Sequence, residues 1–200
     1  ALRGSARSFE SRPLALAFMD RARFTALWER CLSGGERADA STAYEVIATR
    51  YSEPHRFYHN PEHIEHCLRQ HDLASSLMLR PDAVEMAIWF HDIIYDVPTV
   101  HNEQRSADLF MTLAGDSMDP GFDQSVYDMI LATQHRVAPK NDDDKFLVDV
   151  DLSSFGLPWE EMRRHSENVR REFADASDGD FYASHTRFMH ALLDRPEFFV

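Results

Sequence analysis

Apolar side chains recur at intervals of three and four residues along most of the chain, which is the spacing of one face of an α-helix. Asn60-Pro61 is typical of a helix start, and Gly34-Gly35 is typical of a helix end. Alternating runs of β-branched residues between turn dipeptides are nearly absent, so strands are not expected. The pattern predicts about nine helices, over residues 14–32, 43–51, 61–77, 81–95, 102–114, 120–135, 145–155, 159–173 and 181–193.

The chain of 200 residues is long enough for one domain with a sizeable core. It contains no internal repeat, no low-complexity tract and no obvious linker. We therefore expect a single all-α domain over residues 1–200, with a flexible tail at 1–12 and C-terminal helices within 158–195. The apolar residues Phe198-Phe199-Val200 either pack back onto this domain or contact a second copy of the chain. The sequence is therefore compatible with a homo-oligomer.

The net charge of −13 argues against nucleic acid as a partner, because a duplex-binding protein needs a basic stripe and none is visible. A small phosphorylated metabolite remains compatible, since a bound cation reverses the local field. No apolar stretch reaches the length of a membrane span, so no membrane partner is expected. Cys31 and Cys67 are too few for a disulfide framework, which favours a reducing, cytoplasmic location.

Candidate chemistry centres on His91-Asp92, which lies within the apolar segment that begins at Ala87 and ends at Tyr95. A buried histidine beside a buried aspartate is costly unless a partner satisfies both. One interpretation is a core histidine bonded to a backbone carbonyl, and the other is a metal site.

Two further segments favour the metal site. His59 and His63 flank a predicted helix start, although histidines there are also common on surface loops. Asp149 and Asp151 lie in an otherwise apolar segment, where the alternative is a helix cap or a surface pair. Two histidines and two carboxylates suit Mn²⁺, Fe²⁺, Co²⁺, Ni²⁺ or Zn²⁺ better than Ca²⁺, and they leave positions for water and a substrate oxygen.

The order His, His-Asp, Asp on a helical chain resembles the HD superfamily of metal-dependent phosphohydrolases. Within it, the chain is most similar to a bacterial group of predicted HD-type phosphohydrolases. The resemblance covers about residues 51–156, the expected metal-binding core, and rests on four motifs: Glu53-Pro-His-Arg-Phe-Tyr-His-Asn-Pro-Glu-His-Ile64, Trp89-Phe-His-Asp-Ile-Ile-Tyr-Asp96, Asn102-Glu-Gln-Arg-Ser-Ala107 and Asp149-Val-Asp-Leu-Ser-Ser-Phe-Gly156.

The resemblance implies that His63, His91 and Asp92 bind the metal. It favours Asp151 as the fourth ligand, with Asp149 as second choice. It also implies hydrolysis of a phosphate ester or anhydride by a metal-activated water, with a nucleotide as the commonest kind of substrate in the superfamily.

Other roles follow from the same resemblance. Tyr58-His-Asn-x-x-His63 is similar to the signature of cyclic-nucleotide phosphodiesterases, which makes His59 a candidate proton donor. Arg56 is a candidate phosphate ligand or a structural ion pair. His135 is a candidate for contact with substrate or with a metal ligand, and Asp96 for holding a water.

Two other classes of function remain open. Some relatives in the HD superfamily are di-iron oxygenases, and a second iron here would need ligands from His59, Asp96 or His135. The third possibility is a non-catalytic module that binds a metabolite.

Overall fold

The structure is a computed structural model that describes residues 19–34, 38–136 and 138–195. The expected tail at 1–12 and the apolar C-terminal residues 198–200 lie outside the described residues. The described residues form an all-helical fold without a β-sheet, which confirms the prediction of an all-α bundle with about nine helices. The helices are α1 (Arg21–Cys31), α2 (Ala40–Tyr51), α3 (Pro61–Ala74), η1 (Ser75–Leu77), α4 (Pro81–Phe90), α5 (Asn102–Ala114), α6 (Pro120–Ala132), α7 (Asp142–Leu152), η2 (Ser153–Gly156), α8 (Trp159–Glu172) and α9 (Asp178–Leu193).

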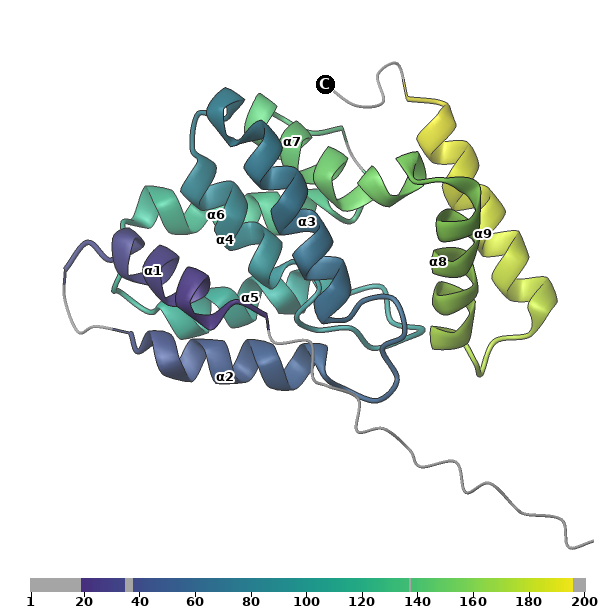
Figure 1. The fold of residues 1–200 in the computed structure, drawn as a ribbon, viewed down its shortest axis with the longest axis horizontal. Coiled ribbons are helices and arrows are strands. Elements are labelled where there is room, and N and C mark those ends of the chain that lie inside the picture. Colours follow the sequence, from purple (N-terminus) through teal and green to yellow (C-terminus); the bar gives the residue numbers. More distant parts are fainter. Residues whose placement is uncertain (1–18, 35–37, 137, 196–200) are drawn as a thin grey trace, which may run out of the picture.

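Helix α4 is the central element of the bundle. It packs against α1, α3, α5, α6 and α7 (Figure 1). Every residue from 83 to 94 is buried. The ring of Trp89 on this helix lies 5.3 Å from that of Phe24 on α1. Because α4 is buried on all sides from residue 83 onwards, its C-terminal end and the His91-Asp92 dipeptide there lie in the interior.

Several helices begin about three residues before the predicted start. Asp39, Asn141 and Ser177 accept hydrogen bonds from backbone N–H groups of the following turn and so cap α2, α7 and α9. The first turn of such a helix is polar, and apolar periodicity does not detect it. Asp20 caps α1 in the same way, and the predicted part of this helix at residues 14–18 lies outside the described residues.

Helix α4 ends at Phe90 and not at residue 95 as predicted. The buried guanidinium of Arg56 donates hydrogen bonds to the carbonyl oxygens of Asp92, at 2.6 Å, and Ile93, at 2.9 Å. The N–H of Asp96, which would bond Asp92 in a continued helix, donates instead to Asn102 Oδ1 at 3.0 Å. The turn is therefore stabilised by partners distant in the sequence.

Helix α6 also ends earlier than predicted, at Ala132. Its last turn is closed by the Thr133 hydroxyl, which donates to the carbonyl of Ile130 at 2.8 Å. His135 then takes a left-handed backbone conformation with φ of 56°. This turn directs the His135 side chain away from the helix axis and towards α7, where its Nε2 lies 3.0 Å from Asp151 Oδ2.

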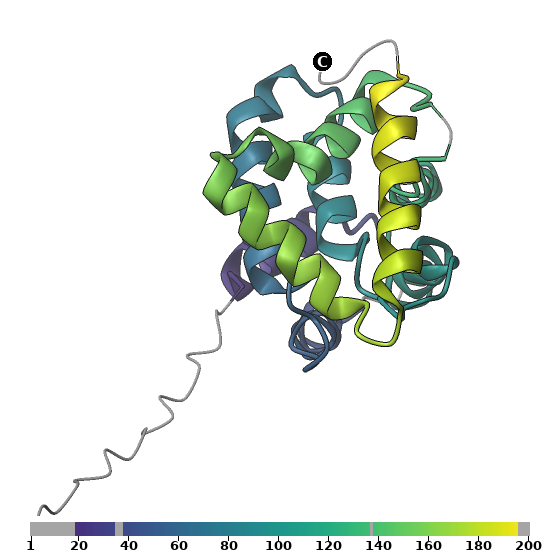
Figure 2. The ribbon, with the colours of Figure 1, turned by 90° about the vertical axis from the view of Figure 1, so that its right-hand side faces the viewer.

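Helices α8 and α9 form a hairpin at one side of the bundle (Figure 1), and Figure 2 shows the two helices in front of the rest of the molecule. The hairpin is attached to the bundle through η2 and through a small apolar cluster in which Leu192 meets Val148 and Leu152 of α7. Within the described ranges, none of the helices has the length and apolar composition needed to cross a membrane.

Candidate metal centre

Four side chains predicted as metal ligands meet at one point between α3, α4 and α7. One ligand atom from each of His63, His91, Asp92 and Asp151 lies within 4.8 Å of all the others. The Nε2 atoms of the two histidines are 3.2 Å apart, and His91 Nε2 lies 3.1 Å from Asp92 Oδ2. His63 Nε2 lies 3.4 Å from Asp151 Oδ1.

These separations fit a shared cation. Ligand atoms about 2.1 Å from one ion lie about 3.0 Å apart in octahedral geometry and about 3.4 Å apart in tetrahedral geometry. Mixed imidazole and carboxylate ligands suit a divalent transition metal. The described residues therefore include a cluster that can hold a metal ion, as the sequence predicted.

Backbone contacts orient the histidine ligands. The Nδ1 of His91 lies 2.9 Å from the carbonyl oxygen of Ile88, which accepts its proton and leaves Nε2 to face the cluster. His63 lies in the first turn of α3, where Asn60 caps the helix and accepts a hydrogen bond from the Glu62 N–H. Its position at the helix start directs the ring towards α4.

The charges in the cluster depend on one another. Burial opposes protonation of His91, but Asp92 and Asp151 outweigh this effect and raise the pKa of His91 well above its usual value. Burial acts to raise the pKa of both aspartates, but the adjacent histidines hold each pKa below its usual range. In the absence of a cation, the cluster therefore retains a proton that metal binding would displace.

The structure distinguishes between the two candidate aspartates on α7. Asp151 belongs to the cluster and Asp149 does not, which agrees with the favoured prediction. The second carboxylate oxygen of Asp151 is 3.0 Å from His135 Nε2. His135 thus contacts the candidate metal ligand Asp151 and can orient it. Contact with a metal ligand was one of the two roles predicted for His135.

The predicted proton donor His59 lies beside the cluster, with its Nε2 3.9 Å from Asp92 Oδ2. Its Nδ1 is 2.6 Å from Oε2 of Glu172, and the ring of Tyr95 stacks on it at a centroid distance of 4.0 Å. Burial acts to lower the pKa of His59, but Asp92 and Glu172 outweigh this effect and raise the pKa. Glu172 and Tyr95 therefore hold the His59 imidazole so that its Nε2 faces the cluster.

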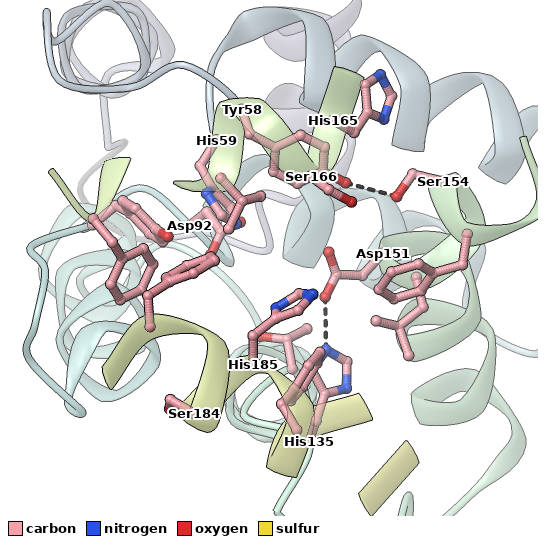
Figure 3. A pocket seen from close by; sticks show the side chains of 18 of the residues that line it. Tyr58, His59, Asp92, His135, Asp151, Ser154, His165, Ser166, Ser184 and His185 are labelled. Atoms are coloured by element: carbon pink, nitrogen blue, oxygen red, sulfur yellow. Dashed lines mark hydrogen bonds and ion pairs between the residues drawn. The ribbon is translucent and has the colours of Figure 1, made fainter. Parts of the chain in front are cut away.

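A pocket of about 530 Å³ opens between the cluster and the α8–α9 hairpin. Asp92 and Asp151 line it together with His59 and His135. Figure 3 shows the side chains of His135 and Asp151 joined by a hydrogen bond inside this space. The ligand carboxylates are thus accessible to a small molecule.

Two predicted site residues lie elsewhere. Arg56 is buried, pairs with Glu53 at 3.1 Å and donates to the carbonyls of Asp92 and Ile93. Its contacts are those of the structural ion pair, one of its two predicted roles, and it does not line the pocket. The Asp96 side chain is 56% exposed and accepts from Arg105 at 2.5 Å. The structure therefore does not bring the Asp96 carboxylate to the cluster.

Glu172 is the main site residue that the sequence analysis missed. Its Oε1 accepts hydrogen bonds from the N–H groups of Phe57, Tyr58 and His59, at 2.8, 2.7 and 2.9 Å. It lies at the C-terminal end of α8, where the helix dipole disfavours a carboxylate. That unfavourable position was the only sequence signal, because residue 172 is far from residue 59 along the chain.

A scan of protein-family models and searches of curated proteins and of solved structures gave no significant match to this chain. The class of protein is therefore defined by its own fold and site. It is an all-helical protein whose described residues include a buried cluster of two histidines and two aspartates that can hold a metal ion.

Proposed function

We propose that this protein is a metal-dependent phosphohydrolase of the HD type that cleaves a phosphate ester or anhydride. The observation that carries the proposal is the joint lining of one pocket by Asp92, Asp151 and His59. The first two are cluster carboxylates, and the third is a buried imidazole directed by Glu172. A bound divalent ion would lower the pKa of a coordinated water and polarise a phosphoryl group.

The residues of the chain have distinct parts in such a reaction. His63, His91, Asp92 and Asp151 hold the ion, and His135 orients Asp151. For an ester, the oxygen of one water forms the new bond to phosphorus and the bond from phosphorus to the alcohol oxygen breaks. His59 Nε2 donates a proton to the departing oxygen, and the proton lost by the water restores His59 at the end of the turnover.

The arrangement does not favour a di-iron oxygenase. A second iron needs ligands of its own, and Asp96, one of the three residues suggested for it, is exposed and paired with Arg105. Among the described residues, a single group has the spacing of metal ligands. A content of two irons per chain would contradict this interpretation.

The proposal is tested by metal analysis and by phosphate release. The protein is purified without chelator, and its metals are quantified by elemental mass spectrometry. Mn²⁺-, Ni²⁺- and Co²⁺-loaded samples are then assayed against a panel of phosphate esters and nucleotides. We expect about one metal per chain and phosphate release that requires it.

Two variants on the same helix sharpen the test. Asp151→Ala removes a ligand and should abolish both stoichiometric metal and phosphate release. Asp149→Ala changes a carboxylate two residues away, outside the cluster, and should retain both. A wild-type protein that neither contains nor acquires a metal would refute the proposal, and equal effects of the two variants would refute the assignment of Asp151.

A further inference from the structure

The wall of the pocket opposite the metal cluster is apolar. Met162 and Val169 lie on one face of α8 and line the pocket together with Phe173, which directly follows the helix. Phe181 and Phe188 recur along one face of α9 and line it from the other side. An amphipathic helix normally buries such a face against protein. Here the two faces border a space of about 530 Å³, which is in the size range of small-molecule sites.

The lining provides little positive charge beyond what a metal would supply. Among the described residues that line the pocket there is no lysine and no arginine. Glu103 and Asp180 add carboxylates to those of the cluster. Burial lowers the pKa of His165 and His185, so both imidazoles are neutral near pH 7.

Two arginines line a neighbouring pocket. Arg69 and Arg164 border a space of about 390 Å³ that shares Tyr58, Ser154 and His165 with the first pocket. The Tyr58 hydroxyl and the Ser154 hydroxyl are hydrogen bonded at 2.8 Å where the two spaces meet (Figure 3). Neither guanidinium is therefore part of the wall that faces the metal carboxylates.

We propose that this pocket binds the apolar or aromatic alcohol portion of a phosphate monoester, so that the protein selects monoesters of apolar alcohols over nucleoside di- and triphosphates. The inference rests on the proposed function, because the cluster places the phosphoryl group. One phosphoryl group needs only the ion as its counter-charge, whereas a polyphosphate would bring further charges against the carboxylates of Glu103 and Asp180. The Phe and Met side chains provide the contact area for the alcohol.

Binding of phosphonates tests this selection without turnover, because a P–C bond is not hydrolysed. Mn²⁺-loaded protein is titrated calorimetrically with methyl-, butyl- and benzylphosphonate and with methylenebisphosphonate. We expect affinity to rise about fourfold for each buried methylene group. Benzylphosphonate should bind at least tenfold more tightly than methylphosphonate, and methylenebisphosphonate should bind more weakly than butylphosphonate.

Variants on the α8–α9 hairpin show whether the gain in affinity along the phosphonate series arises in this pocket. Ser166 lines the pocket on α8, and Ser166→Leu should fill part of the space and reduce the preference for benzyl over methyl several-fold. Val169→Lys should reduce the same preference and strengthen methylenebisphosphonate binding. Thr186→Lys, on an exposed position of α9 outside the lining, is the control and should change neither ratio. Circular dichroism verifies that each variant is folded.

Benzyl alcohol separates this inference from the proposed function. Ligand-observed NMR should detect its binding to metal-free His91→Ala/Asp92→Ala protein and the loss of binding when Ser166→Leu is added. If the wild type holds no metal but benzyl alcohol still binds and Ser166→Leu abolishes this binding, the phosphohydrolase proposal fails and the inference of an apolar binding pocket is retained. If affinity is flat along the phosphonate series, if the bisphosphonate binds best, or if benzyl alcohol does not bind, the inference is wrong.

Discussion

At the scale of single residues, Glu172 links the hairpin to the chemistry of the site. Its carboxylate is buried with 5% of the residue exposed, and it makes four hydrogen bonds to the segment that carries His59. Burial acts to raise the pKa of Glu172, but His59 and the donating N–H groups outweigh it and lower the pKa. An ionised Glu172 therefore holds the His59 Nδ1 proton and leaves Nε2 facing the cluster, where the proposed reaction needs a proton donor.

The substitution Glu172→Gln tests this role. Glutamine keeps one oxygen for the backbone N–H groups but cannot accept the Nδ1 proton, so it disfavours the protonated imidazole. We expect kcat for an alkyl phosphate to fall about 10- to 100-fold with unchanged metal content. The loss should be much smaller for 4-nitrophenyl phosphate, whose leaving group needs no proton.

A purely structural defect would affect both substrates equally, and that result would contradict the positioning role. Glu167→Gln provides the control, because Glu167 is exposed on the same helix and pairs with Arg163 away from the pocket. Its kinetic constants should match those of the wild type.

Sequence and structure agree on three of the four cluster residues because these three are marked locally. His91 and Asp92 are polar residues at the end of an apolar segment, and His63 follows a helix cap. Asp151 has no such mark, and the family resemblance favoured it over Asp149. Arg56 and Asp96 show where such local sequence signals are not sufficient. Their residue types suit phosphate or water binding, but only the three-dimensional contacts reveal that Arg56 closes the turn after α4 and that Asp96 pairs with Arg105.

At the scale of helices, the sequence predicted the order of elements because apolar periodicity and prolines are local. It placed the ends of α4 and α6 wrongly because the carbonyls there are satisfied by Arg56 and Thr133 and not by the next turn. Residues that connect one helix to another are therefore the ones that local patterns miss.

Asp143 is such a connection and permits a stability prediction. It lies in the first turn of α7 and accepts hydrogen bonds from the N–H groups of Leu79 and Arg80 at 2.9 Å each, just before α4 begins. Asp143→Ala leaves two partly buried N–H groups without this acceptor and should lower the free energy of unfolding by about 2–4 kcal/mol. Chemical denaturation measures the change.

Asp142→Ala is the matched control for that measurement. Asp142 occupies the same turn and pairs with Lys145 at the surface, so its removal should cost less than about 1 kcal/mol. Equal losses for the two variants would mean that charge in the first turn of α7, and not the link to α4, provides the stability.

Helix α6 contains a carboxylate in an unfavourable position. Burial, followed by repulsion from Asp119 and Asp116, raises the pKa of Asp123 to about 6. Because its folded-state pKa lies above the unfolded value of 3.8, the native state loses stability as pH rises from about 4 through 6. Asp123→Asn should therefore be more stable than the wild type by about 1 kcal/mol at pH 7, after allowance for solvent screening, and equally stable near pH 4.

Thermal unfolding across this pH range measures the difference. Asp128→Asn, on the same helix, should show no comparable gain, because Asp128 pairs with Lys140 at the surface. A gain for Asp123→Asn that is independent of pH would show that ionisation of this carboxylate is not its cause.

At the scale of the whole molecule, the pocket could not be predicted from the sequence. Its floor comes from the segment after α4 and from α7, and its wall comes from a hairpin of α8 and α9 that follows in the chain. The stripes on α8 and α9 look like ordinary core faces in the sequence, and only their packing leaves space in front of them. The acidic net charge argued against nucleic acid as a partner but gave no indication of an apolar cavity.

The metal cluster also couples distant parts of the fold, and this coupling gives a prediction for global stability. Its four ligands lie on α3, at the end of α4 and on α7, so an ion bound there cross-links three helices of the bundle. A ligand that binds only the native state at about 100 times its Kd stabilises it by about 2.7 kcal/mol. For a chain of this length, that corresponds to about 5–10 °C in Tm.

Chelation of the metal-loaded protein should therefore lower Tm by about 5–10 °C, and added Mn²⁺ should restore it, as measured by calorimetry. The His91→Ala/Asp92→Ala protein should respond to neither treatment, whereas Asp149→Ala should respond as the wild type does. If chelator lowers Tm equally in the double variant, the ion that stabilises the fold is bound elsewhere, and the helices around the pocket are held together without the cluster.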